Sequence, residues 1–422
     1  MLPAITDRQP NPKRQGIKPM QRYQSGAALL AAAALLTTAG TAHAVDPMPL
    51  NQDGPFEFIP TIKVSQGYDD NVNESADGDE ESSNVTKVAP SFLLRAQEQA
   101  NRYQLRYTPS FQRYSHDSDE NRVNHNAAAT AQLTLDSRNR LGLGLTANRN
   151  QSTPGDSEGD PDEGDINERL AFNGDYTFGA RGAQGQIELD GGYVWNRYAN
   201  NLTGTANNQS EEYDSPRFGA RFLWRASPKT QLFVEGRYAD FNYTWSESRL
   251  DSENLSASVG ARWQATAKTS GSFQVGRQEK SFDDATKSDE DVNSWQAQVT
   301  WSPETYSSVT LATANTLEEG SEASAGKSRE NAVEQTTYSI NWDYAWSGRV
   351  NTNLGYSLLE EDSVGGNLDG QSEETDTVTA GVSYSFRRWL DFGFETRFKD
   401  NSADVGDGYD RNTYFLTATL SL

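Results

Sequence analysis

The sequence predicts an all-β protein whose fold is a transmembrane antiparallel β-barrel of the outer membrane, with about 18 strands. Two observations lead to this prediction. Apolar residues recur at every second position in many segments, which is the period of a strand with one apolar face. The connections between these segments are alternately short and long, as in barrels that cross a bacterial outer membrane.

The composition by itself describes a polar and acidic protein. The 422 residues are 35% hydrophobic, the formal net charge is −23, and the mean hydropathy is −0.79. The absence of cysteine excludes a disulfide framework, a thiolate metal site and a thiol nucleophile. The 60 acidic against 37 basic residues argue against a nucleic-acid binder. Because alternating strands escape a hydropathy window, the low hydropathy is compatible with a membrane barrel.

The first 44 residues have the pattern of a signal peptide. A basic leader precedes an apolar run at 27–36, and residues 42–44 (Ala-His-Ala) form the small-x-small pattern that a signal peptidase accepts. The run is shorter than the roughly 20 residues of a membrane-spanning helix, which disfavours the alternative of an N-terminal anchor. We therefore expect a signal peptide over 1–44, a short periplasmic segment over 45–55, and the barrel over 56–422.

The alternation can be followed from 103–111 through 218–224 and 257–263 to 377–386 and 390–394. It is clearest in the last segment, where Tyr414, Leu416 and Leu420 alternate mainly with threonine and serine. Each set can cover the roughly 9–11 residues that a tilted strand needs to cross a bilayer. The chain ends on Leu422, whereas an aromatic residue is usual at the end of such barrels.

Short turns and long polar loops follow one another along the chain. Eight short turns recur about every 40 residues, at 99–101, 136–139, 180–183, 227–230, 267–270, 302–305, 346–348 and 387–389. Nine longer polar stretches lie at 69–84, 116–121, 152–165, 200–212, 246–253, 283–290, 318–330, 362–375 and 400–409. Together they join eighteen strands, with both termini on the short-turn, periplasmic side. A β-propeller has a similar repeat length but no such alternation of connections.

Five tryptophans lie at or beside the short turns. We expect them to form an aromatic girdle at the periplasmic membrane interface, where amphipathic rings are enriched. These residues are Trp224, Trp263, Trp301, Trp346 and Trp389.

Several motifs carry a resemblance that spans the whole chain after the signal peptide. They are Gly67-Tyr68-Asp69-Asp70-Asn71-Val72, the repeated Trp-x-x-Ser-Pro or Trp-Ser-Pro turns at 224–230 and 301–305, and the ending from Tyr384 to Tyr409. The sequence resembles the outer-membrane β-barrel porins of exopolysaccharide operons, the EpsL-type group. The resemblance implies an outer-membrane barrel that takes part in export of a surface polysaccharide, and it supplies no catalytic residues.

Alternate positions of the strands should point into the lumen if the apolar positions face lipid. The charged residues that we expect to line the pore are mainly arginines, and they are Arg95, Arg106, Arg221, Glu235, Arg237, Arg262, Glu395 and Arg397. The alternative is that these charges only hold the wall together, with Arg237 pairing with Glu235 and Arg397 with Glu395. Tyr114, Phe233 and Phe415 also fall on the inward side, where they either stack on sugar rings or fill space.

The sequence gives little support to metal or enzyme chemistry. Acidic residues crowd loops 69–84 and 152–165, but neither has the spacing of an EF-hand, and solvated carboxylates are the simpler interpretation. After signal removal only His116 and His125 remain as candidate bases, and neither has an evident partner for nucleophilic catalysis. We expect no enzymatic activity, no cofactor and no dedicated metal site.

The function that these patterns favour is a porin-like channel for a hydrophilic solute. The expected partners are outer-membrane lipids and lipopolysaccharide, the latter bridged to acidic loops by divalent cations, together with a polysaccharide and periplasmic export proteins; nucleic acid is not expected. The alternative is a structural or adhesive surface barrel whose acidic loops bind divalent cations or partners. A barrel hydrolase is the least favoured reading.

Overall fold

The computed structural model describes residues 49–51, 54–116, 121–153, 164–202, 208–324, 327–406 and 408–421. In these ranges no helix is long and apolar enough to span a membrane. The described residues include two short 3-10 helices, η2 (Asn208–Glu211) and η3 (Gly366–Leu368). The strands are β1 (Glu57–Asp69), β2 (Ser83–Glu98), β3 (Asn101–Tyr114), β4 (Arg122–Thr134), β5 (Asn139–Gln151), β6 (Ile166–Phe178), β7 (Gly185–Tyr198), β8 (Tyr213–Ser227), β9 (Thr230–Tyr243), β10 (Ser252–Thr266), β11 (Thr269–Phe282), β12 (Glu290–Glu304), β13 (Ser307–Ser324), β14 (Lys327–Ala345), β15 (Val350–Val364), β16 (Ser372–Arg387), β17 (Leu390–Ala403) and β18 (Tyr409–Ser421).

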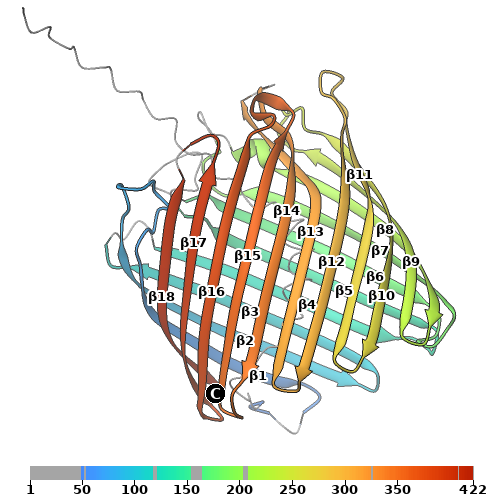
Figure 1. Ribbon diagram of the computed structural model, residues 1–422, viewed down its shortest axis with the longest axis vertical. Helices are drawn as coiled ribbons and strands as arrows, with labels where there is room; N and C mark the ends of the chain where they lie inside the picture. Colours follow the sequence, from blue (N-terminus) through green and yellow to red (C-terminus); the bar gives the residue numbers. More distant parts are fainter. Residues whose placement is uncertain are drawn as a thin grey trace, which may run out of the picture.

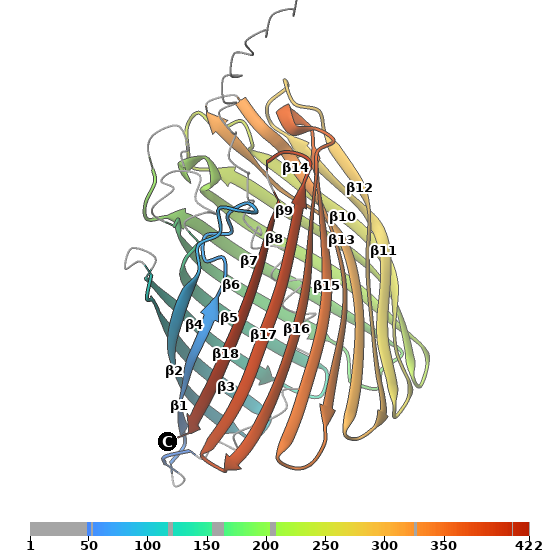
Figure 2. The ribbon, with the colours of Figure 1, turned by 60° about the vertical axis from the view of Figure 1, so that its left-hand side comes forward.

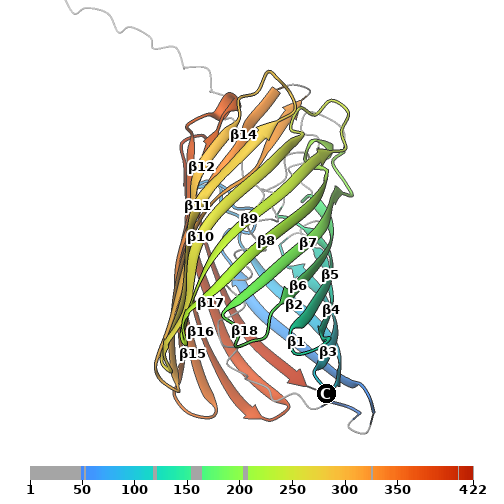
Figure 3. The same cartoon turned by 90° about the vertical axis from the view of Figure 1, so that its right-hand side faces the viewer.

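All eighteen strands form one antiparallel sheet that closes into a barrel (Figure 1). Each strand pairs with its neighbours in sequence, and β1 pairs with both β2 and β18. In the closing pair Thr61 lies opposite Ser421 and Asp69 opposite Thr413. The predicted fold class is therefore confirmed. The strands are strongly tilted, and the short turns lie at the same end as the C-terminus (Figure 3).

Side-chain hydrogen bonds help to fix one of the short turns. Between β4 and β5, Oδ1 of Asp136 accepts hydrogen bonds from the backbone N–H groups of Arg138 at 2.7 Å and Asn139 at 2.9 Å. The bond from Arg138, with a second from the Asn139 side chain, lowers the pKa of the Asp136 carboxyl. An aspartate at the first position of a tight turn commonly makes such bonds.

The two faces of the sheet differ in polarity. Large apolar side chains are exposed on one face, among them Phe222 at 45%, Val234 at 53% and Leu416 at 67%. This much exposed apolar surface is unfavourable in water but suits contact with lipid. Charged and polar side chains, such as Glu235, Arg237 and Thr417, occupy many of the intervening positions, so the predicted two-residue period separates a lipid face from a polar face.

The five tryptophans of the expected girdle lie where the strands meet the short turns. Trp224, Trp263 and Trp301 are each three residues from the end of β8, β10 and β12, whereas Trp346 and Trp389 lie in turns. Trp224, Trp301, Trp346 and Trp389 are about half exposed or more.

One loop is much shorter than the sequence predicted. Residues 318–330 read as a polar loop, but β13 runs to Ser324 and β14 begins at Lys327. Residues of this segment pair with one another, for example Ser321 with Glu330 and Glu322 with Ser328. Backbone pairing beyond the membrane does not require apolar alternation, so the sequence gives no sign of it. The strand ends at 362–364, 372–375 and 400–403 extend past the expected loop boundaries in the same way.

Gly260 provides a test of the packing inside the barrel. It lies directly opposite Phe233, and a Cβ at Gly260 would come within 2.4 Å of Phe233 Cζ and of the Phe273 carbonyl oxygen. We expect Gly260→Ala to lower the free energy of unfolding by about 1–3 kcal/mol, since overpacking forces the neighbours to shift. Urea unfolding of the refolded barrel, followed by tryptophan fluorescence, measures this loss.

The control is Gly236→Ala on β9. A Cβ there meets only the Ser256 carbonyl oxygen, at 4.0 Å, so the unfolding midpoint should stay close to that of the wild type. Equal midpoints for the two variants would contradict the packing argument.

Candidate functional site

The lumen face of the sheet can be assigned because side chains from distant strands meet on it. The hydroxyl of Tyr243 on β9 donates a hydrogen bond of 2.9 Å to Oε2 of Glu319 on β13, four strands away. Only the concave inner face of a closed sheet allows such a contact. Glu235 and Arg237 share this face with Tyr243 because they lie at even spacings from it on the same strand.

An ion-pair cluster on β7 to β10 brings together four of the eight charged residues that the sequence singled out. Arg221 lies 2.8 Å from Oε1 of Glu235 and 3.2 Å from Oε2 of Glu188. Nε of Arg237 also contacts Oε1 of Glu235, at 2.6 Å, and Arg262 lies 3.5 Å from Glu188. Three guanidinium groups thus face two carboxylates. We call these five residues the arginine cluster.

The ring of Phe233 packs against two guanidinium groups of the arginine cluster. The guanidinium carbon of Arg221 lies 4.8 Å from the ring centroid, and that of Arg262 lies 5.6 Å from it. Gly260, opposite Phe233, leaves room for the ring against the wall. The same arrangement recurs at Phe415, which lies over Gly67 and holds the ammonium of Lys87 at 4.2 Å. Cation–π contacts of this kind hold cations in place without neutralising them.

The four remaining predicted pore residues lie apart from the arginine cluster. Arg95 forms an ion pair with Glu57 on β1. Glu395 pairs with Lys63 at 2.6 Å, so the expected pair of Glu395 with Arg397 is wrong. The reason is barrel closure, which brings Lys63 on β1 to within two strands of β17. In the described part of the chain Arg106 and Arg397 have no ion pair.

The extracellular end of the barrel is narrowed by the β13–β14 hairpin. Pairing of β13 with β12 stops at Asn315, opposite Trp295. Beyond it, Leu317 N–H donates to Oε1 of Gln278 on β11 at 3.2 Å, and Nε2 of Gln278 donates to the Leu317 carbonyl at 2.8 Å. The hairpin therefore crosses the inner side of β12 to reach β11. The upper ends of β13 and β14, orange in Figure 2, lean over the opening.

A buried ion pair fastens this hairpin. Nζ of Lys280 on β11 lies 2.5 Å from Oε1 of Glu319, and Tyr243 holds the other carboxylate oxygen. Lys280 is fully buried, with its ammonium 4.7 Å from the ring centroid of Phe241. Helix η2, from the β7–β8 connection, also packs against β13. We call Tyr243, Lys280 and Glu319 the latch.

The acidic loop between β1 and β2 is held by basic residues of the chain itself. Arg411 contacts Asp69 at 2.6 Å and Glu74 at 2.9 Å, and Lys399 contacts Glu74 at 3.0 Å. Asp70 accepts hydrogen bonds from Asn412. Three carboxylates of this loop, which was expected to be solvated, therefore form ion pairs or hydrogen bonds with residues of β17 and β18. Among the described residues no group of acidic or histidine side chains has the arrangement of a metal site. Most of the second acidic loop, 154–163, lies outside the described residues.

The structure gives contacts for both histidines that the sequence singled out. The backbone N–H of His116 donates to Ser83 Oγ at 3.1 Å. His125, which had no evident partner in the sequence, stacks on Tyr107 and shares a hydrogen bond of 2.8 Å between Nδ1 and the Tyr107 hydroxyl.

Sequence reasoning missed several charged residues of the lumen. Glu188 could have been found, since it alternates with Ile187 and Leu189. Lys280 and Glu319 carried no usable signal, because their meeting depends on the departure of β13 from the wall.

A comparison with protein families agrees with the observed fold. Residues 51–422 match the family described as "Putative beta-barrel porin 2". The chain belongs to this family. The protein is therefore a porin-like β-barrel of the outer membrane, in a family of channels rather than enzymes. A comparison with curated proteins gives no match.

The chain is also similar to several solved structures from Pseudomonas aeruginosa. OpdO is 10% identical with a TM-score of 0.47, and the alignment covers 86% of this chain and 97% of that chain. The outer membrane protein OpdK is 11% identical with a TM-score of 0.45, covering 87% and 99%. OpdQ is 12% identical with a TM-score of 0.47, covering 87% and 98%.

The latch leads to a prediction about the mouth of the barrel. Replacing Lys280 by Met leaves the buried Glu319 without its cation, which should destabilise the inward hairpin by about 3 kcal/mol. We expect a larger single-channel conductance of the refolded barrel in planar bilayers, because the hairpin leaves the opening.

Lys63→Met is the matched control. The ion pair of Lys63 with Glu395 also lies on the inner wall, but it is more exposed and does not hold the hairpin. If Lys280→Met gives the same conductance as Lys63→Met and the wild type, the latch does not control the opening.

Proposed function

We propose that the barrel is a channel for a hydrophilic, negatively charged solute, and that a surface exopolysaccharide is the class of solute. The observation that carries the proposal is the arginine cluster, in which three guanidinium groups face two carboxylates. A barrel of 16–18 strands is wide enough for an aqueous channel. Basic side chains on such a wall favour the passage of anions.

Two further features support an anion rather than a neutral sugar. Arg106 and Arg397 add positive charge that no ion pair in the described ranges offsets. The inward rings of Phe233, Phe415 and Tyr114 each face a cation, the last of them Arg122 at 5.1 Å. Those ring faces are therefore occupied, so charge rather than sugar stacking would select the solute. The eight charged residues predicted from the sequence act, in this proposal, as the pore lining.

The resemblance to the EpsL-type porins supports a polysaccharide as the solute. In that role the short-turn end of the barrel would face periplasmic export proteins that deliver the chain, and the latch would open for its passage. The inward β13–β14 hairpin equally favours a second candidate, a sealed structural or adhesive barrel. Planar-bilayer conductance separates the two, because a sealed barrel opens at no voltage.

The arginine cluster should set the ion selectivity. The triple variant with Arg221, Arg237 and Arg262 each replaced by Gln leaves Glu188 and Glu235 without counter-charges. We expect the reversal potential in a potassium chloride gradient to change sign, from anion to cation preference. Glu188→Gln with Glu235→Gln should move it in the opposite direction. Unchanged reversal potentials in both variants would show that this cluster does not control selectivity.

An acidic oligosaccharide tests the class of solute. Oligogalacturonate added to the wild-type channel should interrupt the ion current at concentrations at which a neutral dextran of similar length does not. The triple arginine variant should lose these interruptions because the anionic sugar is no longer attracted. Equal interruption by both oligosaccharides, or none by either, would argue against an anionic polysaccharide.

A further inference from the structure

A row of polar side chains crosses the lipid-facing side of the barrel near its extracellular end. On β4 to β7, His125 lies directly opposite Arg149, Arg149 opposite Glu168, and Glu168 opposite Arg197. The row faces outward, because its members lie at even spacings from exposed apolar residues such as Val123, Leu145 and Leu170 on their own strands. This outer-face row plays no part in the proposed channel.

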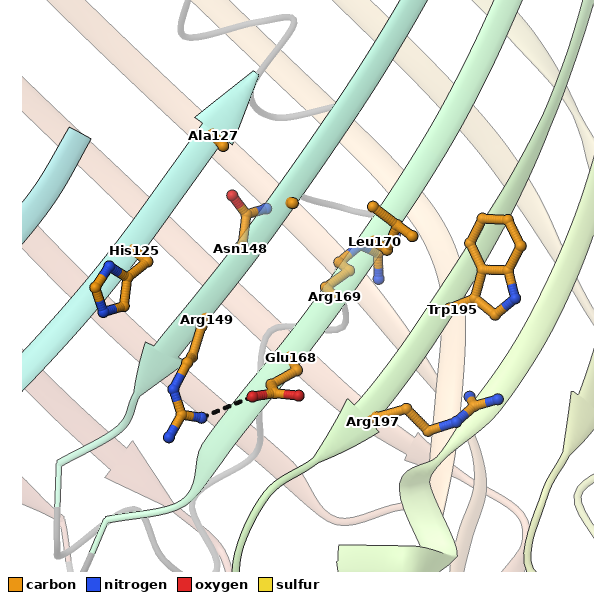
Figure 4. Close-up of a pocket in the computed structure, with 10 residues that line it drawn as sticks. His125, Ala127, Asn148, Arg149, Glu168, Arg169, Leu170, Trp195 and Arg197 are labelled. Carbon is orange, nitrogen blue, oxygen red and sulfur yellow. Dashed lines mark hydrogen bonds and ion pairs between the residues drawn. The ribbon is translucent and has the colours of Figure 1, made fainter. Parts of the chain in front are cut away.

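A hollow in the apolar surface adjoins the row (Figure 4). Its volume is about 380 Å³, and the next row of side chains supplies its apolar lining, Ala127, Ala147, Leu170 and Trp195. The two alanines are directly opposite each other. Their small side chains lie between the bulkier Tyr107 on one side and Leu170 on the other, which leaves the depression.

Ion pairs hold the two arginines of the row at the edge of the hollow. Nη1 of Arg149 lies 2.7 Å from Glu168, and Nη2 of Arg197 lies 2.6 Å from Asp214. Arg149 remains 40% exposed and uses one of its nitrogens in the pair, so its other N–H groups can meet a second anion. His125 is oriented by its hydrogen bond with Tyr107.

The charge of the outer face varies around the barrel. Outward arginines near the extracellular end lie on three strands of the β3–β7 sector, as Arg113, Arg149 and Arg197. On β15 to β18 the corresponding outward positions carry carboxylates, namely Glu360, Glu374, Asp376, Asp400 and Asp410. An anionic lipid headgroup would therefore meet arginines on the β3–β7 sector, two of them paired with Glu168 and Asp214, and carboxylates on β15–β18.

We propose that the outer-face row and its hollow bind a phosphorylated glycolipid of the outer leaflet, lipopolysaccharide, with its phosphates on Arg149 and Arg197 and an acyl chain in the hollow. Guanidinium groups bind phosphate through paired, charge-assisted hydrogen bonds. The site has the two surfaces that such a lipid needs, basic side chains at headgroup level and an apolar depression beside them. The lipid would share each arginine with the carboxylate that already orients it.

Native mass spectrometry of the detergent-solubilised barrel with added lipid A tests the proposal. Replacing both Arg149 and Arg197 by Gln should raise the dissociation constant of the tightest-bound lipid on the order of 10-fold or more, given the strength of charge-assisted hydrogen bonds. Arg277→Gln is the matched control, since Arg277 on β11 also faces outward and pairs with Asp291 on β12. Its lipid binding should equal that of the wild type.

A second variant tests the hollow without changing charge. Ala147→Trp fills the depression from the lipid side, where a large apolar side chain is compatible with folding, and it should weaken lipid A binding as well. Heat-modifiable migration on gels verifies that every variant is folded. Wild-type binding by either the double arginine variant or Ala147→Trp would overturn the proposal.

The chemical form of the lipid separates phosphate recognition from general lipid adhesion. Lipid A with both phosphates removed should bind no better to the wild type than to the double arginine variant. Inorganic phosphate at the same concentration should not displace lipid A, because it lacks the acyl chains. Equal binding of the dephosphorylated lipid, or displacement by free phosphate, would overturn the assignment to a phosphorylated glycolipid.

Discussion

The pairing of β1 with β18 is the contact on which the rest of this structure depends. Backbone N–H and C=O groups cannot be left unpaired in hydrocarbon, so a sheet that spans a membrane must have no free edge. Here the closing partners, such as Ile62 and Leu420, are separated by almost the whole barrel sequence. Closure also gives the sheet one convex and one concave face. Every alternate residue is thereby committed either to lipid or to the lumen.

The residues that face the lumen are largely charged. Arginines on the inner wall are held by a smaller number of carboxylates and by aromatic rings that lie against glycines, as Phe233 does beside Gly260. This arrangement orders the cations while leaving net positive charge. At the extracellular opening the ion pair leaves no excess charge. Lys280 and Glu319 are buried and neutralise each other, and they hold a hairpin across the opening. In the proposed channel, the arginine cluster would set the ion selectivity and the latch would set access, at different heights of one wall.

The sequence predicted the contacts that depend on neighbouring positions and failed on those that depend on closure. The pair of Glu235 with Arg237, expected from the sequence as an alternative to a pore lining, is present, and the two residues project from one side of one strand. The pair of Glu395 with Arg397 was predicted by the same reasoning and is wrong, because Lys63 comes in from the far end of the chain. The loop after β1 was read as solvated for a similar reason: Arg411, which neutralises Asp69 and Glu74, lies more than 300 residues away.

The sequence by itself determined the strand number, the side on which the turns are short, and which residues face lipid. These follow from a two-residue period and from the spacing of polar connections, both of which are local. Only the tertiary structure decided how the inner charges pair, that β13 leaves the wall after Asn315, and that His125, Arg149 and Arg197 gather beside a hollow on the outside. The physical reason is that strand register and barrel curvature, rather than sequence distance, bring these side chains together.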